Sequence, residues 1–162
     1  IALLRNAGQD IAVVFAGGPW AGAASYFETI KSYARARLGP RAIFLGSRDD
    51  VPDIYADIDV AVHPSHSEDL GGAVESLLAG VPTVATNVGG FPDIVIPGMT
   101  GWLCEPRSPK SLASAIAETL SDRDRAIRLA EAGRELVSVE LDVRRTARQV
   151  SDFYQHVRSR TI

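Results

Sequence analysis

Short apolar runs alternate with longer amphipathic stretches along most of the chain. Residues 11–16 form an uninterrupted apolar run that ends at two glycines, a pattern typical of a strand buried on both faces of a sheet. Further strands are predicted at residues 42–45, 59–63, 83–86 and 102–104. Strands this short, separated by helical stretches, favour a doubly wound parallel sheet covered by helices.

Helices are predicted between these strands, over residues 26–38, 49–57 and 71–79, and they dominate the chain after residue 108. Ser108 and Pro109 supply an N-cap and a first-turn proline. One side of the helix that they begin carries Leu112, Ile116 and Leu120. In the last helix, spacings of four and three predict one packed apolar stripe opposite an arginine-rich solvated face. The stripe comprises Val143, Ala147, Val150, Tyr154 and Val157.

The first residues have the pattern of the end of an amphipathic helix. Ile1 and Leu4 share one side, Gly8 stops the helix, and no N-cap precedes Ile1. We therefore expect the sequence to be part of a longer protein. Its 162 residues, 46% of them hydrophobic, fit one domain with a core of its own, so we expect a single domain over residues 1–162.

The charge balance narrows the range of partners. With 17 basic against 20 acidic residues the net charge is -3, which gives no general electrostatic reason to expect nucleic acid or an acidic membrane. The one cysteine, Cys104, cannot form an intrachain disulfide, so a reducing, cytoplasmic compartment is the expectation. No apolar run reaches the roughly 18 residues of a membrane-spanning helix.

The candidate chemistry lies in residues 63–75, where a polar loop and two glycines separate a predicted strand from a predicted helix. Gly71 and Gly72 would let a ligand approach the backbone closely, and the helix N-terminus carries a partial positive charge. Together these features suit a diphosphate. Packing alone also explains a pair of glycines at such a turn, so the residues by themselves leave both interpretations open.

Two neighbouring segments give the sequence a resemblance to a known family. They are SEDLGGAVESLLAGVPTVATNVGGFPDIV at residues 67–95 and GMTG at residues 98–101. They resemble the donor-site signature of family 4 (group 1) glycosyltransferases, and the similarity extends from about Ala12 to Pro106. The resemblance implies the C-terminal half of a GT-B fold, an α/β, Rossmann-like doubly wound parallel sheet in three layers (α/β/α). It also implies nucleotide-sugar donor binding for retaining glycosyl transfer to an unknown acceptor.

The resemblance implies roles for two glutamates. Glu75 matches the second glutamate of the family's paired acidic motif, which implies hydrogen bonds to the ribose hydroxyls of the donor. Its alternative role is that of a first-turn glutamate that complements the helix dipole. The family places seven residues between its two glutamates, whereas six separate Glu68 from Glu75, and the family spacing falls on Ser67. Either Glu68 takes the sugar-facing, catalytic position through a one-residue change in the loop, or Ser67 and Asp69 share that contact, or Glu68 is a solvated loop carboxylate.

Five further residues match donor-binding positions of the family. Gly71 and Gly72, with Leu70 beside them, match the backbone around the donor phosphates and sugar. Gly17 and Gly46 match loops that approach the nucleotide and its base. For these last two, a turn glycine without ligand contact explains the sequence equally well.

Family members hold the diphosphate with an arginine and a lysine that follow the first strand of this domain. We expect that strand, the basic pair and the N-terminal acceptor domain to lie outside residues 1–162. Retention in the family is attributed to front-face displacement, in which a donor phosphate takes the acceptor's proton, so we expect no protein nucleophile. The charge that develops on the leaving diphosphate would need the basic pair. Little or no transfer is therefore expected from these residues alone.

The expected partners are a UDP- or GDP-sugar and the N-terminal domain of the same protein. As in relatives, the last helix is expected to pack on that domain, which would leave an apolar patch exposed on residues 1–162. We expect no cofactor, no metal and no nucleic acid, and contact with the inner face of a membrane only through the other half of the protein. Two other functions stay open. One is a nucleotide-sugar epimerase of the related two-domain fold, and the other is a non-catalytic nucleotide-binding or protein-interaction domain of flavodoxin-like topology.

Other candidate residues favour structural roles. His63 and His66 have a loop spacing that could bind zinc, but Cys104 is remote and the ligands are too few. His63 is therefore expected at a strand end that lines the cleft. Trp20 and Trp102 could stack on a base or sugar, although packing at a domain edge is the commoner role of such residues.

Overall fold

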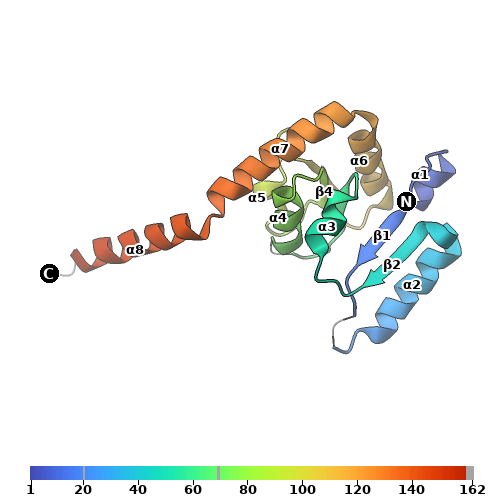
Figure 1. Cartoon of the computed structure of the whole chain (residues 1–162), viewed down its shortest axis with the longest axis horizontal. Helices are drawn as coiled ribbons and strands as arrows, with labels where there is room; N and C mark the ends of the chain where they lie inside the picture. The colour runs from blue at the N-terminus through green and yellow to red at the C-terminus, as the bar shows by residue number, and fades with distance from the viewer. Residues whose placement is uncertain (20, 69, 160–162) are drawn as a thin grey trace.

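The computed structural model describes residues 1–19, 21–68 and 70–159. It shows an α/β arrangement in which parallel strands alternate with helices, as the sequence predicts (Figure 1). In chain order the elements are α1 (Ala2–Asn6), β1 (Val13–Ala16), α2 (Ala24–Leu38), the 3-10 helix η1 (Gly39–Arg41), β2 (Ala42–Gly46), α3 (Val51–Ala56), β3 (Ala61–His63), α4 (Gly71–Leu78), β4 (Thr83–Thr86), α5 (Phe91–Ile94), β5 (Trp102–Cys104), α6 (Pro109–Ser121), α7 (Arg123–Glu140) and α8 (Val143–Ser159).

The strands form two parallel sheets. β1 pairs with β2, and the second sheet has the order β3-β4-β5. The structure confirms the parallel pairing but differs from the continuous sheet that the alternation predicts. Among the described residues, β1 and β3 each have one edge without a neighbouring strand.

The second sheet has helices on both faces, with β4 at its centre. All four residues of β4 are buried. Val84 packs in one cluster with Ile116 of α6 and Leu129 of α7, whereas Ala85 packs in another cluster with Leu77 of α4. Successive residues of a strand point to opposite faces, so the two clusters lie on the two sides of the sheet. This is the three-layer arrangement expected from the sequence.

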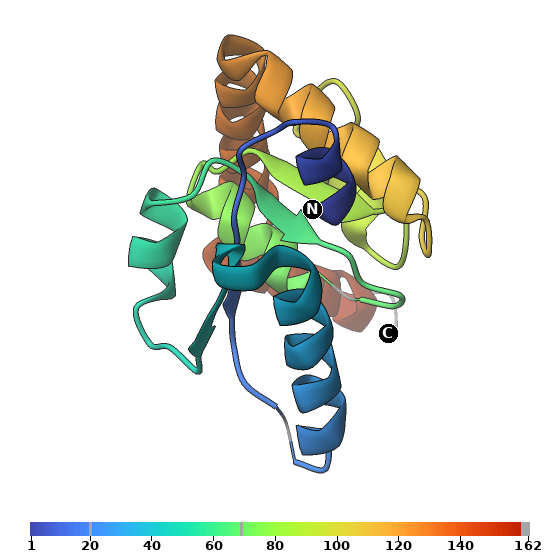
Figure 2. The ribbon, with the colours of Figure 1, turned by 90° about the vertical axis from the view of Figure 1, so that its right-hand side faces the viewer.

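β1 is covered on one face only, so the prediction of a strand buried on both faces is wrong. Phe15 stacks on Phe44 of β2 with ring centroids 4.5 Å apart, and Phe27 of α2 meets Phe44 edge-on at 6.1 Å. α2 thus covers one face of the first sheet, at the opposite end of the molecule from α6 and α7 (Figure 2). On the other face Val14 and Ile43 are exposed at 38% and 41%. An apolar run alone does not specify how many faces are covered.

α8 leaves the body of the molecule after Leu141, and none of its described residues is buried (Figure 1). The apolar stripe predicted from the spacing is exposed, with Val143 at 77% and Tyr154 at 64%. The stripe is not packed within the described chain, because the helix points away from the other elements. This exposure contradicts a stripe packed inside the domain and agrees with the apolar patch expected on residues 1–162, while packing on the N-terminal domain stays a prediction. On the side of α6 that carries Ile116 and Leu120, Ile116 is buried whereas Leu120 is exposed at 37%.

The two long helices before α8 begin at side-chain caps. Ser108 Oγ accepts a hydrogen bond from the N–H of Ser111 at 3.2 Å and Pro109 is the first residue of α6, which confirms the predicted start. Asp122 Oδ1 accepts from the N–H of Arg125 at 2.9 Å at the start of α7. None of the described helices combines the length and the apolar character that a membrane span requires.

Candidate functional site

The loops that follow β3 and β4 meet at one edge of the second sheet. They are the β3–α4 loop (residues 64–70) and the β4–α5 loop (residues 87–90). Because the strands are parallel, their carboxyl ends lie side by side. The buried hydroxyl of Thr86, at the end of β4, donates to the carbonyl of Ser65 at 2.7 Å and lies 3.3 Å from that of His63. This contact fixes the start of the β3–α4 loop to the end of β4.

Gly89 brings the two loops into backbone contact. Its φ is +53°, and a Cβ built on it would lie 1.8 Å from the carbonyl oxygen of Glu68. No side chain fits at that separation, and the positive φ itself favours glycine. The β4–α5 loop therefore packs directly on the backbone of the β3–α4 loop.

α4 begins at Gly71, and the side chain of its N-cap residue, Leu70, forms no capping hydrogen bond. A Cβ on Gly72 would lie 3.1 Å from Nδ1 of His63, so this glycine lets the helix start lie directly on the imidazole. Gly71 is exposed, whereas Leu70 and Gly72 are half-buried. The N-terminus of a helix attracts anions through its N–H groups and its dipole. The two glycines themselves add no side chain to this helix start.

Glu68 is held within the β3–α4 loop. Ser65 Oγ donates to Glu68 Oε2 at 3.3 Å, and Glu68 is half-buried. Ser67 is exposed, and Asp69 lies outside the described residues. The structure therefore places Glu68 beside the start of α4, while its catalytic role stays a prediction.

Glu75 lies beyond the first turn of α4 and is exposed. That turn contains no acidic residue, so the alternative role of Glu75 as a first-turn partner of the helix dipole is wrong. Burial, followed by the charge of Glu75, raises the pKa of the Tyr55 hydroxyl in α3. The same hydroxyl donates to the carbonyl of Gly72 at 3.5 Å. Tyr55 therefore belongs to the site, although nothing in the sequence pattern singles it out.

A chain of polar contacts begins at His63 beneath α4. Its Nε2 lies 3.0 Å from Ser76 Oγ, which lies 2.9 Å from Thr83 Oγ1. Each of these hydroxyls also donates to a nearby backbone carbonyl. These contacts tie the imidazole to α4 through Ser76 and to the start of β4 through Thr83.

His63 should make the stability of the fold depend on pH. Burial lowers the pKa of its imidazole from 6.5 to about 4. Between these values the unfolded chain binds a proton that the folded chain does not, so the free energy of unfolding should fall by roughly 2–3 kcal/mol as the pH drops from 6.5 towards 4. Urea unfolding across this range should show the slope, and His63→Gln should flatten it. The exposed His156 of α8, changed to Gln, is the control, and an unaltered slope in His63→Gln would contradict this assignment.

Gly17 and Gly46 meet at the ends of β1 and β2. The N–H of Gly17 donates to the carbonyl of Gly46 at 2.8 Å, and both glycines have positive φ angles. Beside them, a Cβ on Gly18 would lie 2.7 Å from Oγ of Ser47. Residues 47–50 line a shallow polar hollow, in which Arg48 forms an ion pair with Asp50. Both loops lie at the carboxyl end of the first sheet, as the sequence predicts, while contact with a base stays a prediction.

The sequence model of the family described as glycosyl transferases group 1 matches residues 1–136. This chain belongs to the group 1 glycosyltransferases. It is 34% identical over 152 residues to the GDP-mannose-dependent alpha-(1-6)-phosphatidylinositol monomannoside mannosyltransferase of Mycobacterium tuberculosis. The matched region covers 87% of this chain and 38% of that protein. It is also 32% identical over 161 residues to the 2-deoxystreptamine glucosyltransferase of Streptomyces kanamyceticus. That matched region covers 97% of this chain and 40% of that protein.

Solved structures share the fold of this group 1 domain. The Anabaena protein HepE, in complex with UDP, matches with a TM-score of 0.84 and 27% identity over 90% of this chain and 41% of its own. Sucrose-phosphate synthase from Thermosynechococcus elongatus matches with a TM-score of 0.81 and 29% identity over 98% of this chain and 42% of its own. The chain thus spans 38% to 40% of the length of the two curated relatives described above.

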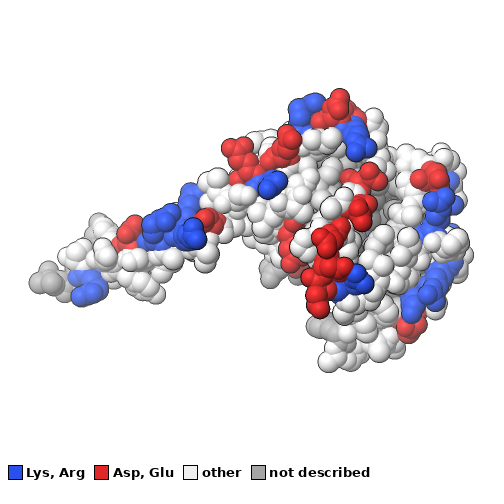
Figure 3. Space-filling model, in the orientation of Figure 1, with Lys and Arg blue, Asp and Glu red and all other residues white. Residues whose placement is uncertain are grey.

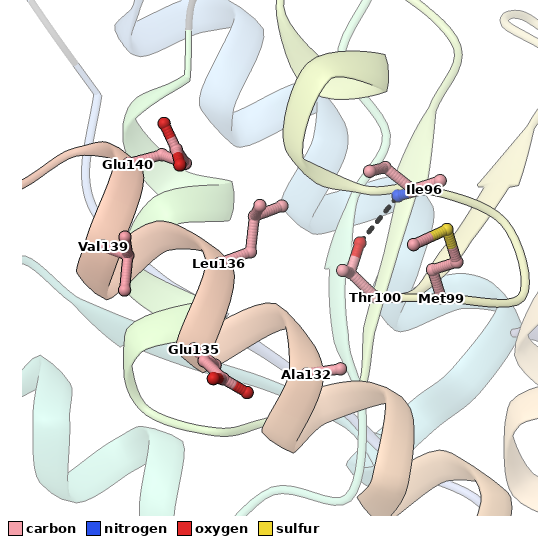
Figure 4. A pocket seen from close by; sticks show the side chains of 8 residues that line it. All are labelled: Ile96, Met99, Thr100, Ala132, Glu135, Leu136, Val139 and Glu140. Carbon is pink, nitrogen blue, oxygen red and sulfur yellow. Dashed lines mark hydrogen bonds between the residues drawn. The ribbon is translucent and has the colours of Figure 1, made fainter.

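An apolar cavity of about 330 Å³ lies elsewhere in the glycosyltransferase domain, between α7 and the segment before β5 (Figure 4). Met99 contributes to its lining together with Leu136 and Val139 of α7. Thr100 Oγ1 accepts from the N–H of Ile96 at 2.7 Å beside it. Met99 and Thr100 belong to the GMTG segment, but neither of the two glutamates nor any of the five further residues matched to donor-binding positions lines this cavity.

The remaining candidates have structural positions or lie outside the described residues. Trp102 is buried in the core cluster of Val84 and therefore packs against neighbouring side chains. Trp20 lies outside the described residues, and His66 is exposed. Within the described ranges, no group of three or more His, Cys, Asp and Glu side chains could hold a metal ion.

Proposed function

We propose that this glycosyltransferase domain binds a nucleotide-sugar donor at the start of α4. The observation that carries the proposal is the joint position of Gly71, Gly72 and Glu75, with two glycines at the helix N-terminus and an exposed carboxylate one turn later. The helix start suits a diphosphate, and carboxylate oxygens accept hydrogen bonds from ribose hydroxyls. The β3–α4 and β4–α5 loops, packed together at Gly89, lie beside it.

The proposed donor is a UDP- or GDP-sugar. The similar HepE structures contain UDP, UDP with glucose, or UDP-glucose, and the mycobacterial relative is named as GDP-mannose-dependent. The loops of Gly17 and Gly46 are proposed to approach the nucleotide and its base, because they lie at the carboxyl ends of neighbouring parallel strands.

The full-length protein is proposed to transfer the sugar with retention of configuration. In front-face displacement, the bond from the anomeric carbon to the diphosphate breaks as the acceptor oxygen bonds to the same face. A donor phosphate oxygen takes the acceptor's proton, so no side chain forms a covalent bond. Glu68, held by Ser65, is proposed to face the sugar, while Glu75 and the two glycines orient the nucleotide.

The leaving diphosphate requires positive charge. Figure 3 shows acidic side chains gathered around α3, beside the candidate site. The start of α4 therefore supplies only part of the attraction that a diphosphate needs. We infer that an arginine and a lysine from outside residues 1–162 complete the site, and that residues 1–162 alone transfer little or no sugar.

Two features support further contacts with the rest of the full-length protein. β1 and β3 each have an edge without a strand neighbour among the described residues, and one additional parallel strand placed between them would give the doubly wound order. The exposed stripe of α8, with Val143 and Tyr154, is proposed to pack on the N-terminal acceptor domain.

Calorimetric titration of the full-length protein with UDP, GDP, ADP and their sugar conjugates tests donor binding. We expect saturable binding of a uridine or guanosine nucleotide, and Glu75→Ala should weaken it about 10- to 100-fold because charge-assisted hydrogen bonds to the ribose are lost. Glu131→Ala, which removes an exposed glutamate of α7, is the matched control and should bind normally. Equal affinities in Glu75→Ala and the parent would contradict the site, and no binding of any nucleotide would contradict the function.

A further inference from the structure

Tyr55 links α3 to the start of α4. Its side chain is half-buried, and its hydroxyl reaches the carbonyl of Gly72 in the first turn of α4. In Figure 1, α3 lies beside α4 on the same side of the molecule. Tyr55 therefore joins the segment after β2 to the proposed ribose-binding helix.

The hydrogen bond from the Tyr55 hydroxyl to that carbonyl is long and therefore weak. The oxygen–oxygen distance is 3.5 Å, whereas such hydrogen bonds are usually about 2.7–2.8 Å long. A proton held this weakly is available to a better acceptor. Glu75 follows Gly72 by three residues in α4 and so lies on the same face of the helix. Its charge adds to burial in raising the pKa of the Tyr55 hydroxyl, and an ionised carboxylate is a stronger acceptor than a carbonyl.

We propose that Tyr55 is a positioning residue for ribose recognition, which acts by donating its hydroxyl proton to one carboxylate oxygen of Glu75. Glu75 is exposed and its long side chain has several rotamers in the absence of a partner. One hydrogen bond from a half-buried ring restricts these rotamers and leaves the second carboxylate oxygen for the hydroxyls of the ribose. The inference rests on the proposed function, since it concerns the same nucleotide site.

The electrostatics keep Tyr55 in the state that this role requires. Burial and the charge of Glu75 both raise the pKa of the phenol, so it stays protonated at neutral pH. A neutral phenol donates one hydrogen bond. Tyr55 therefore keeps the proton that it donates to Glu75 at neutral pH.

A double-mutant cycle on the full-length protein tests the inference. Tyr55→Phe removes only the hydroxyl and should shift the thermal midpoint by less than about 3 °C. We expect it to weaken binding of the preferred nucleotide, UDP or GDP, about 3- to 10-fold, and to change affinity less than about twofold when Glu75 is already alanine. With the 2′,3′-dideoxy analogue of that nucleotide, which lacks the ribose hydroxyls, Tyr55→Phe should have almost no effect. Tyr33→Phe, on the exposed side of α2, is the matched control.

The outcomes separate this inference from the proposed function. A normal response to Glu75→Ala together with an unchanged affinity in Tyr55→Phe would overturn the role of Tyr55 and leave donor binding intact. Two further results for Tyr55→Phe would also overturn it: an equal loss of affinity for the nucleotide and its dideoxy analogue, or a loss of affinity that persists in the Glu75→Ala background. A general structural role of Tyr55 predicts both results. If the parent protein binds no nucleotide, the proposed function fails and the inference fails with it.

Discussion

Replacing Gly89 with alanine is expected to lower the free energy of unfolding by roughly 2–5 kcal/mol and to abolish nucleotide binding. The added Cβ would lie 1.8 Å from the carbonyl oxygen of Glu68, in a conformation with φ of +53°. The carbonyl belongs to the backbone, so relief of the clash requires the β3–α4 loop to move. That loop leads into the start of α4, and its displacement would change the geometry of Glu68 and Gly71 together.

A substitution at a second glycine distinguishes the effect of the steric clash on stability from the effect of backbone strain. Gly98 has a φ of +76°, and a Cβ on it would meet no atom within 4 Å. Gly98→Ala should therefore lower the free energy of unfolding by only about 1–2 kcal/mol, because alanine is strained in the left-handed conformation but meets no steric clash. Urea unfolding followed by circular dichroism measures both variants. Equal losses of stability in Gly89→Ala and Gly98→Ala would show that the contact with Glu68 has no energetic weight.

The elements that the sequence predicts well are those with local signals. The strands predicted at residues 83–86 and 102–104 coincide with β4 and β5, because each is a short stretch of β-branched or apolar residues bounded by loop residues. Ser108 and Pro109 predict the start of α6 for the same reason, since an N-cap and a first-turn proline act within one turn. The two glycines before Glu75 likewise locate the start of α4.

The features that the sequence does not predict depend on contacts between distant segments. Whether Val14 is covered depends on which elements pack against the first sheet, and whether the stripe of α8 is buried depends on what the helix meets. The contact of Gly89 with Glu68 exists only because β3 and β4 place their following loops side by side. Tyr55 joins the site through the same kind of contact, from α3 to α4.

Phe91→Ala should lower the free energy of unfolding by about 3–5 kcal/mol, through lost burial and the cavity that remains. Phe91 is the first residue of α5, directly after the β4–α5 loop, and it has no accessible surface. It packs in the core cluster with Leu77 and Val137. The matched control is Phe153→Ala in α8, where 64% of the side chain is exposed and the change should be within about 0.5 kcal/mol. Similar losses in the two variants, measured by urea unfolding, would contradict the role of Phe91 in the core.

The same substitution should also raise the pKa of His63, which connects the core to the site. The rings of Phe91 and His63 lie 5.9 Å apart, and burial is the cause of the low pKa of this imidazole. A cavity left by the phenyl ring borders a polar group and can admit water, which lowers the penalty for protonation. The His63 pKa should then move from about 4 towards 6.5, and the acid loss of stability should become shallower. Titration of the His63 ring by NMR in the parent, Phe91→Leu and Phe91→Ala proteins measures this. A large loss of stability with an unchanged His63 pKa would mean that Phe91 supports the core without shielding the imidazole beneath α4.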